Sequence, residues 1–122
     1  MQVSKKKLNT NIKKQIDEIF LKLIVDTDTV SEAKTIFWDL LSETEQQAIV
    51  KRLAIAIFLD KGRSYENIKN YLKVSSATIA SVNEKMGDPG MVLALQKVKA
   101  EEWAEDWSKK ISSLVGKVLP GK

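Results

Sequence analysis

The chain has 122 residues, with 20 Lys and Arg against 16 Asp and Glu, so its formal net charge is +4. It contains no Cys and no His, which excludes disulfides, thiolate metal sites, cysteine nucleophiles and histidine acid–base chemistry. The longest apolar run, residues 53–59, is too short to cross a bilayer, because a spanning helix needs about 20 residues. We therefore expect a cytoplasmic protein that is not an enzyme and holds no membrane anchor, cofactor or metal.

Residues 1–8 form a basic arm that contains three lysines and no acidic residue. We expect this arm to be disordered. A basic arm can bind phosphates non-specifically, or it can be a solvated tail. The sequence favours neither interpretation over the other.

The first predicted helix begins at Asn9 or Thr10 and is broken by Asp26, Thr27 and Asp28. Apolar residues recur along it at helical spacing, which predicts one buried face: Ile12, Ile16, Ile19, Phe20 and Leu23.

Thr29 and Glu32 then have the spacing of a capping box, in which each side chain binds an exposed backbone N–H of the other residue. The second helix has its own apolar side: Ala33, Ile36, Phe37, Leu40 and Leu41. Trp38 falls off this side, so it either packs at the rim of the core or contacts a second subunit.

A second capping box, Ser42 with Glu45, starts the third helix, and Gly62 is suited to end it as a left-handed cap. Residues 53–59 of this helix are apolar on every side. Such a helix must be covered all round, and the other predicted helices are too short to do so in one chain. The sequence therefore predicts an intertwined dimer.

Residues 64–85 predict two short helices joined by a tight turn at 73–74. Ser64 can cap the first helix with its hydroxyl, and Ile68 and Leu72 lie on one face of it at i, i+4 spacing. This is the pattern of a helix-turn-helix. A helical hairpin packed inside a bundle is the alternative.

Ser75 can cap the second helix of this pair, on which we expect Ile79 and Val82 to face inward. The outward residues are small and uncharged: Ser76, Ala77, Ala80 and Ser81. A helix that enters the major groove must bring such side chains within reach of base edges. Basic residues surround this face: Lys61, Arg63, Lys69, Lys73 and Lys85.

A break at residues 87–90 precedes the last predicted helix, over 88–116, in which Pro89 suits the first position. Its apolar residues fall within one arc: Leu93, Ala100, Trp103, Ala104, Trp107, Ile111 and Leu114. We expect this arc to pack on the first two helices of the same chain or of a partner chain.

Five motifs occur in a recognisable order: residues 40–45 (LLSETE), 51–53 (KRL), 61–64 (KGRS), 68–72 (IKNYL) and 77–79 (ATI). In these motifs, over residues 37–86, the chain resembles the Trp repressor superfamily, and most closely its YerC/YecD-type branch. The resemblance implies an all-α fold and an intertwined homodimer that binds palindromic operator DNA. It divides the chain into the arm 1–8, a Trp-repressor-like domain over 9–86 with its helix-turn-helix at 64–85, and the helix 88–116 packed on the same core.

The tryptophan-sensing members imply a ligand pocket whose Arg and Thr positions are matched here by Arg52, Ser42 and Thr78. A second Arg and the following Gly of those members are replaced here by Ser81 and Val82. This change removes the planar cation that would stack on an indole ring. We therefore do not expect tryptophan to be a corepressor, and the effector stays unknown. Arg52 has another interpretation, which we favour: an ion pair with Glu45 or Glu66.

These observations predict a homodimeric transcriptional regulator, a repressor of genes with palindromic operators, whose partner is double-stranded DNA. The residues expected to contact DNA are Lys69, Lys73, Ser75, Ser76, Ala77, Ala80, Ser81 and Lys85. No outward residue before Asn83 can make a strong bidentate contact with a base, so we expect modest specificity. The alternative is a protein-interaction module that retains the fold without binding DNA.

Overall fold

A computed structural model describes residues 9–102 of the protein, and every regular element among them is a helix. The predicted basic arm 1–8 and the last helix from residue 103 onward lie outside the described residues. The contacts between residues divide the chain into two compact units, of which the first ends at Val50 and the second begins at Lys51. The prediction of an all-α protein is therefore confirmed for the described residues.

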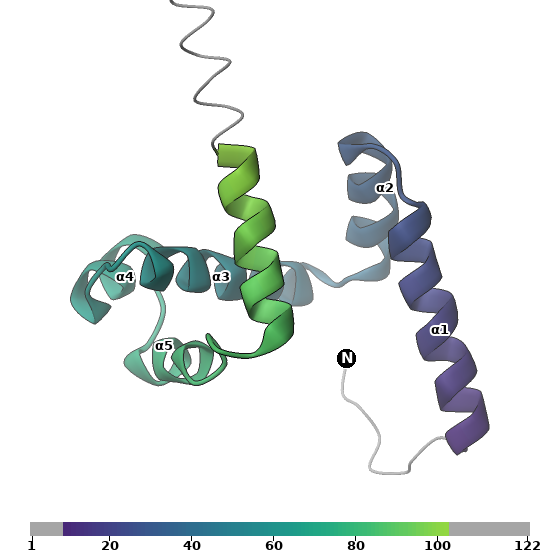
Figure 1. Ribbon diagram of the computed structural model, residues 1–122, viewed down its shortest axis with the longest axis horizontal. Coiled ribbons are helices and arrows are strands. Elements are labelled where there is room, and N and C mark those ends of the chain that lie inside the picture. The colour runs from purple at the N-terminus through teal and green to yellow at the C-terminus, as the bar shows by residue number, and fades with distance from the viewer. Residues whose placement is uncertain (1–8, 103–122) are drawn as a thin grey trace, which may run out of the picture. The chain divides into compact units, whose positions relative to one another are not determined.

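The first unit begins with a helical hairpin, α1 (Thr10–Asp26) and α2 (Val30–Leu40), drawn in purple and blue in Figure 1. Asn9 caps α1 by accepting the N–H of Asn11 at 2.9 Å. Thr29 caps α2 by accepting the N–H of Glu32 at 3.0 Å, which is half of the predicted capping box. The rings of Phe20 and Phe37 meet edge to face, with centroids 6.3 Å apart, and so join the two helices.

The predicted capping box of Ser42 and Glu45 is complete. The N–H of Ser42 donates to Oε1 of Glu45 at 2.8 Å, and the N–H of Glu45 donates to Oγ of Ser42 at 3.2 Å. These hydrogen bonds, above all the one from the Ser42 backbone, lower the pKa of the Glu45 carboxyl. Nε2 of Gln46 donates to the carbonyls of Trp38 and Leu41, both at 3.0 Å, and so satisfies the C-terminal end of α2.

The helices of the first unit have apolar faces that this unit leaves open by itself. No residue of α1 or α2 is buried. On the predicted face of α1, Ile19 is 67% exposed and Phe20 is 47% exposed. The predicted apolar face of α1 thus exists, but the first unit does not cover it by itself.

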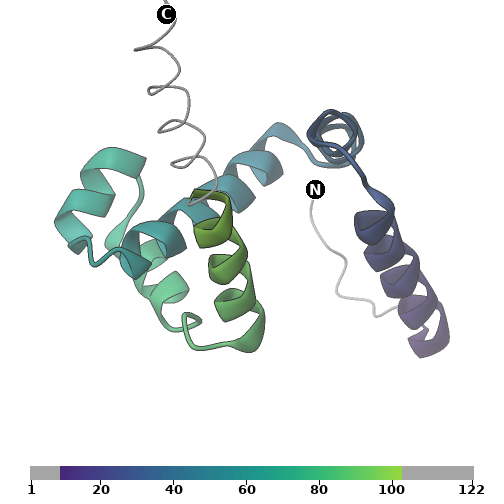
Figure 2. The same cartoon turned by 45° about the horizontal axis from the view of Figure 1, so that its top comes forward.

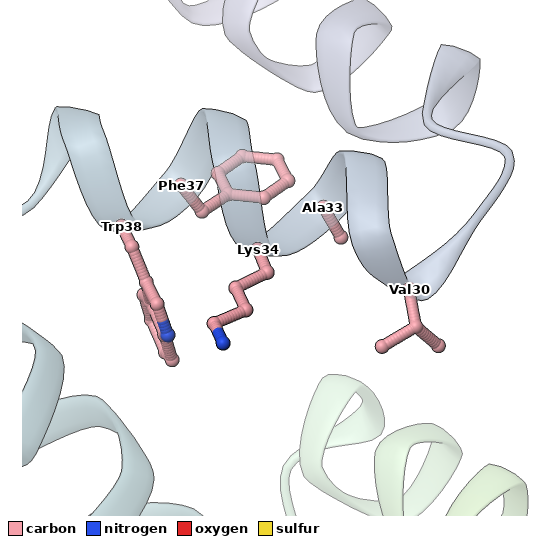
Figure 3. Close-up of a pocket in the computed structure, with 5 residues that line it drawn as sticks. All are labelled: Val30, Ala33, Lys34, Phe37 and Trp38. Carbon is pink, nitrogen blue, oxygen red and sulfur yellow. The ribbon is translucent and has the colours of Figure 1, made fainter.

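Two hollows lie on α2. One, of about 330 Å³, is lined by Val30, Ala33, Lys34, Phe37 and Trp38, and Figure 3 shows Lys34 and Trp38 extending to the same side of the helix. The other, of about 300 Å³, is lined by apolar residues alone, which we call the apolar cavity: Phe20, Ile24, Phe37, Trp38, Leu40, Leu41 and Ile49.

The second unit has a true core. α4 (Tyr65–Leu72), α5 (Ser76–Asn83) and the helix that begins at residue 89 gather around the second half of α3 (Glu43–Asp60), as Figures 1 and 2 show. The buried side chains come from all four helices: Ile55, Ala56, Ile68, Ile79, Val82 and Leu95. This core fixes α4 and α5 against each other.

Most of the apolar run of α3 is covered within the second unit, where Ile57, Phe58 and Leu59 are partly buried against the core. Ile55 and Ala56 are buried, whereas Leu53 is 41% exposed. The helix ends as predicted at Gly62, whose φ of +77° is left-handed. The N–H groups of Gly62 and Arg63 donate to the carbonyls of Leu59 and Phe58, both at 3.0 Å.

The helix from residue 89 is helical through residue 102, the last described residue. It packs on the second unit through Met91 and Leu95, whereas Leu93 is 54% exposed and Ala100 is exposed. Two ion pairs fasten it to the end of α3, Lys99 with Asp60 at 3.0 Å and Lys61 with Glu102 at 3.2 Å. The helix therefore has apolar residues on two sides. The side with Met91 and Leu95 packs on the second unit, and the predicted arc with Leu93 and Ala100 is the other side.

Among the described residues, no helix is both long enough and apolar enough to cross a membrane.

Candidate nucleic-acid interface

The first helix of the candidate motif, α4, is held by its cap and its buried face. Oγ of Ser64 accepts the N–H of Asn67 at 3.1 Å, and Ile68 is fully buried. Lys73 ends the helix in the left-handed conformation, with φ 56° and ψ 53°, and its N–H donates to the Lys69 carbonyl at 2.9 Å. A residue with a side chain is strained in this conformation, which glycine adopts freely.

The second helix, α5, begins with a local network of hydroxyl groups. Oγ of Ser75 accepts the N–H of Thr78 at 3.1 Å, and the hydroxyls of Ser75 and Thr78 form a hydrogen bond of 2.9 Å. Ser75 is therefore the predicted N-cap, and its hydroxyl is engaged within the protein. The first turn of α5 is positioned before any ligand arrives.

The outward side of α5 is accessible and carries no charge. Ile79 and Val82 are buried, as predicted from their spacing. Of the four residues expected on the outward face, Ser76, Ala77 and Ser81 are exposed and Ala80 is partly buried. The fold thus presents a small polar surface, backed by the core of the second unit.

Cations flank this surface. Lys73 and Lys85 are exposed, at the two ends of α5, and Lys69 is partly buried on α4. The guanidinium of Arg63 lies over the Phe58 ring at 5.8 Å, a position typical of a cation–π contact. Lys61 differs from these residues because it forms the ion pair with Glu102.

Lys51 is a cation near the motif that sequence reasoning missed. Its ammonium donates a long hydrogen bond of 3.4 Å to the carbonyl of Lys73, in the turn between α4 and α5. Lys51 lies four residues before the buried Ile55, so both are on the same side of α3. That spacing is the signal that could have placed Lys51 beside the motif.

The three residues predicted for a ligand pocket have other local surroundings. Ser42 is engaged in the capping box with Glu45, and Thr78 is engaged with Ser75. Arg52 is exposed on α3. None of the ion pairs between described residues includes Arg52, so the predicted pair with Glu45 or Glu66 does not form in this structure.

Comparison with known proteins matches the sequence of this chain to one family. A family model described as "Trp repressor protein" matches residues 14–99, which is most of the chain. The uncharacterized protein YerC of Bacillus subtilis (strain 168) is 31% identical over 91 residues, which cover 73% of this chain and 86% of YerC. No solved structure matches the chain significantly. The matched family is one of regulatory DNA-binding proteins rather than enzymes. The chain belongs to the Trp repressor family and is a YerC-type member of it.

Proposed function

We propose that the protein is a transcriptional repressor that binds palindromic operator DNA as a homodimer and does not use tryptophan as corepressor. The observation that carries this proposal is the outward face of α5. It is accessible, small and uncharged, while the opposite side of the same helix is anchored in the core by Ile79 and Val82.

This face suits base contacts in the major groove. Ser76, Ala77, Ala80 and Ser81 are short enough for the α5 backbone to approach base edges closely. Alanine methyl groups can contact thymine methyl groups, and serine hydroxyls can bond to either purine. None of these side chains can make a bidentate contact with a base. We therefore expect modest sequence specificity from direct base contacts, with recognition of DNA shape adding to it.

The lysines beside the face suit the phosphate backbone. We assign Lys69, Lys73 and Lys85 to phosphate contacts, which set the register of the protein on DNA without reading sequence. Ser75, also expected at the interface, contributes by holding the first turn of α5 through the Thr78 N–H.

The open apolar faces of the first unit support a homodimer. Burying one large apolar side chain is worth roughly 1.5–3 kcal/mol, so a row of such residues left in water favours association. Ile12, Ile16 and Ile19 are each at least half exposed along α1, on the face that the sequence pattern predicts to be buried. A second copy of the chain offers the same face, as a two-fold symmetric interface requires.

Two residues support the proposal that tryptophan is not the corepressor: Ser81 and Val82, which replace the Arg and Gly of the tryptophan-sensing members. Ser81 carries no charge with which to hold a carboxylate, and Val82 is used by the core. Arg52 remains exposed and available for another anion.

Fluorescence anisotropy with a pool of random duplexes, at two salt concentrations, tests the proposal. We expect binding that weakens steeply as salt rises, because phosphate contacts release counterions. The matched variants are Ser81→Glu, which should abolish binding by placing a carboxylate against the groove, and Lys14→Glu on α1, which should not abolish it.

Absence of binding at low salt would contradict the proposal. It would favour the alternative of a protein-interaction module that kept the fold and lost DNA binding. A stable complex with another protein, and no salt-dependent affinity for DNA, would then be the expected behaviour.

A further inference from the structure

We propose that Lys51 is a further DNA contact, whose ammonium binds a backbone phosphate beside the turn between α4 and α5. This inference rests on the DNA binding of the proposed function and deepens it, because Lys51 belongs to α3 and not to the helix-turn-helix itself. It places a second cation at the turn, next to Lys73.

The packing of the second unit brings Lys51 to the turn. Its Nζ donates a hydrogen bond of 3.4 Å to the carbonyl of Lys73, a residue 22 positions later in the chain. Lys51 is partly buried, and it lies one helical turn before Ile55, which is fully buried. The ammonium is therefore held at the turn by the core side of α3.

The turn that receives this hydrogen bond is itself fixed. Leu72 and Val74, on either side of Lys73, both pack against the core of the second unit. Lys73 lies between them in the left-handed conformation, with φ 56°, and is exposed. The carbonyl that holds the Lys51 ammonium thus has a defined position, with the charged side chain of Lys73 beginning at the same residue.

The Lys51 ammonium keeps donors for a ligand. A lysine ammonium has three N–H donors, and Lys51 uses one of them on the Lys73 carbonyl. Among residues 9–102, neither Lys51 nor Lys73 forms an ion pair. A cation is favourable beside the C-terminal end of a helix, here α4. Lys51 can therefore bind an anion without giving up its contact with the turn.

The way in which a helix-turn-helix docks identifies this anion. The second helix enters the major groove with its first residues at the base edges, while the first helix crosses the sugar–phosphate backbone. The turn that joins the two helices is then beside that backbone. An ammonium at the turn meets phosphates rather than bases, so Lys51 raises the affinity for all duplexes alike.

The alternative role of Lys51 is to hold the turn through the Lys73 carbonyl alone. The two roles differ in how the affinity for DNA depends on salt. A phosphate contact releases counterions, so its loss lowers the slope of log K against log salt by about 1 for each copy of the chain on the DNA. Loss of a contact within the protein lowers the affinity by the same factor at every salt concentration.

Fluorescence anisotropy of the full-length chain with a random-sequence duplex, at about 50 and about 200 mM salt, distinguishes these roles. Lys51→Met removes the ammonium and keeps a long apolar side chain on α3. The ratio of the unmodified affinity to that of Lys51→Met should fall roughly threefold per bound copy between the two salt concentrations. Lys51→Arg keeps the charge and should retain the slope. Lys22→Met on α1 is the matched control and should change neither affinity nor slope.

A chemical footprint tests the same contact without a substitution. Acetylation of lysine amines in the unmodified chain, followed by mass spectrometry of its peptides, compares the protein with and without the duplex. We expect DNA to slow the acetylation of Lys51 several-fold and to leave that of Lys22 unchanged. Equal acetylation of Lys51 in both samples would overturn the inference, even if Lys51→Met did not fold.

The outcomes separate this inference from the function on which it rests. Salt-dependent binding by the unmodified protein, with the same slope for Lys51→Met, would overturn the phosphate contact and leave DNA binding intact. Equal affinities of the two proteins at both salt concentrations would do the same. Absence of binding by the unmodified protein at low salt would overturn both.

Discussion

The hydroxyl groups of Ser75 and Thr78 lie 2.9 Å apart at the start of α5, and the Ser75 hydroxyl also accepts the Thr78 N–H. This pair fixes the first turn of the candidate recognition helix from within. Ser75→Ala should therefore lower the free energy of unfolding by about 1 kcal/mol, the usual effect of losing an N-cap. Chemical denaturation measures it. Ser76→Ala is the matched control, because Ser76 is exposed and not the cap, and an equal loss there would contradict the assignment.

Lys73 combines a strained backbone with a candidate phosphate contact. Its φ of 56° is left-handed, so Lys73→Gly should raise the free energy of unfolding by roughly 0.5–1 kcal/mol. The same change removes a cation and should weaken DNA binding. Lys73→Ala should weaken binding equally without stabilising the fold. If Lys73→Gly binds DNA as tightly as the unmodified protein, Lys73 is not a phosphate contact.

The salt dependence of DNA binding measures how many phosphate contacts the protein makes, including those of the lysines at the ends of the motif. Lys85→Ala should reduce affinity for all sequences alike and lower the slope of log K against log salt by about 1. Lys22→Ala on α1 is the control and should leave the slope unchanged. A sequence-dependent loss for Lys85→Ala would show instead that Lys85 reads bases.

The carboxyl of Glu45 should make stability depend on pH. Hydrogen bonds from Ser42 lower its pKa below the ordinary 4.5 in the folded protein. The stabilisation is thus fully present above pH 4.5 and is lost as pH falls through the lower folded pKa. Unfolding curves between pH 3 and 7 should show Glu45→Gln losing part of this dependence, whereas Glu43→Gln, which changes an exposed carboxylate outside the capping box, should keep it. Identical pH profiles for Glu45→Gln and the unmodified protein would contradict this prediction.

The exposed face of α1 tests the dimer. Ile19→Glu should shift the protein toward monomers in sedimentation, because the carboxylate would be buried at the interface without a partner. Lys14→Glu, on the opposite side of α1, should leave the dimer intact. Circular dichroism checks that both variants stay helical. A fully dimeric Ile19→Glu protein would place the interface elsewhere.

Local chemistry explains why much of the second unit could be predicted. The caps at Ser64 and Ser75 and the left-handed end at Gly62 depend on residues close in sequence, and all are present. The hydrogen bond of Lys51 to Lys73 was missed because it joins residues 22 positions apart. Sequence spacing does not report such a tertiary contact unless the buried face of α3 is already known.

The last helix shows a different limit of sequence reasoning. Its periodicity predicted an arc through Leu93 and Ala100 that packs on the first two helices, which stays a prediction, whereas Leu95, outside that arc, is the residue in the core of the second unit. A helix with apolar residues on two sides can pack with either, and periodicity alone does not decide which side meets the chain's own core. The ion pair predicted for Arg52 does not form, because an exposed charged side chain gains little from a single partner and is not held by it.

In the proposed dimer, two copies of α5 read the two halves of a palindrome. Selection of bound duplexes from a random pool, followed by sequencing, tests it most directly. We predict an enriched palindrome whose half-sites lie about one helical turn apart, near 34 Å. Salt-sensitive binding without any enriched symmetric sequence would contradict the claim of operator recognition, even if the protein proved to be a dimer.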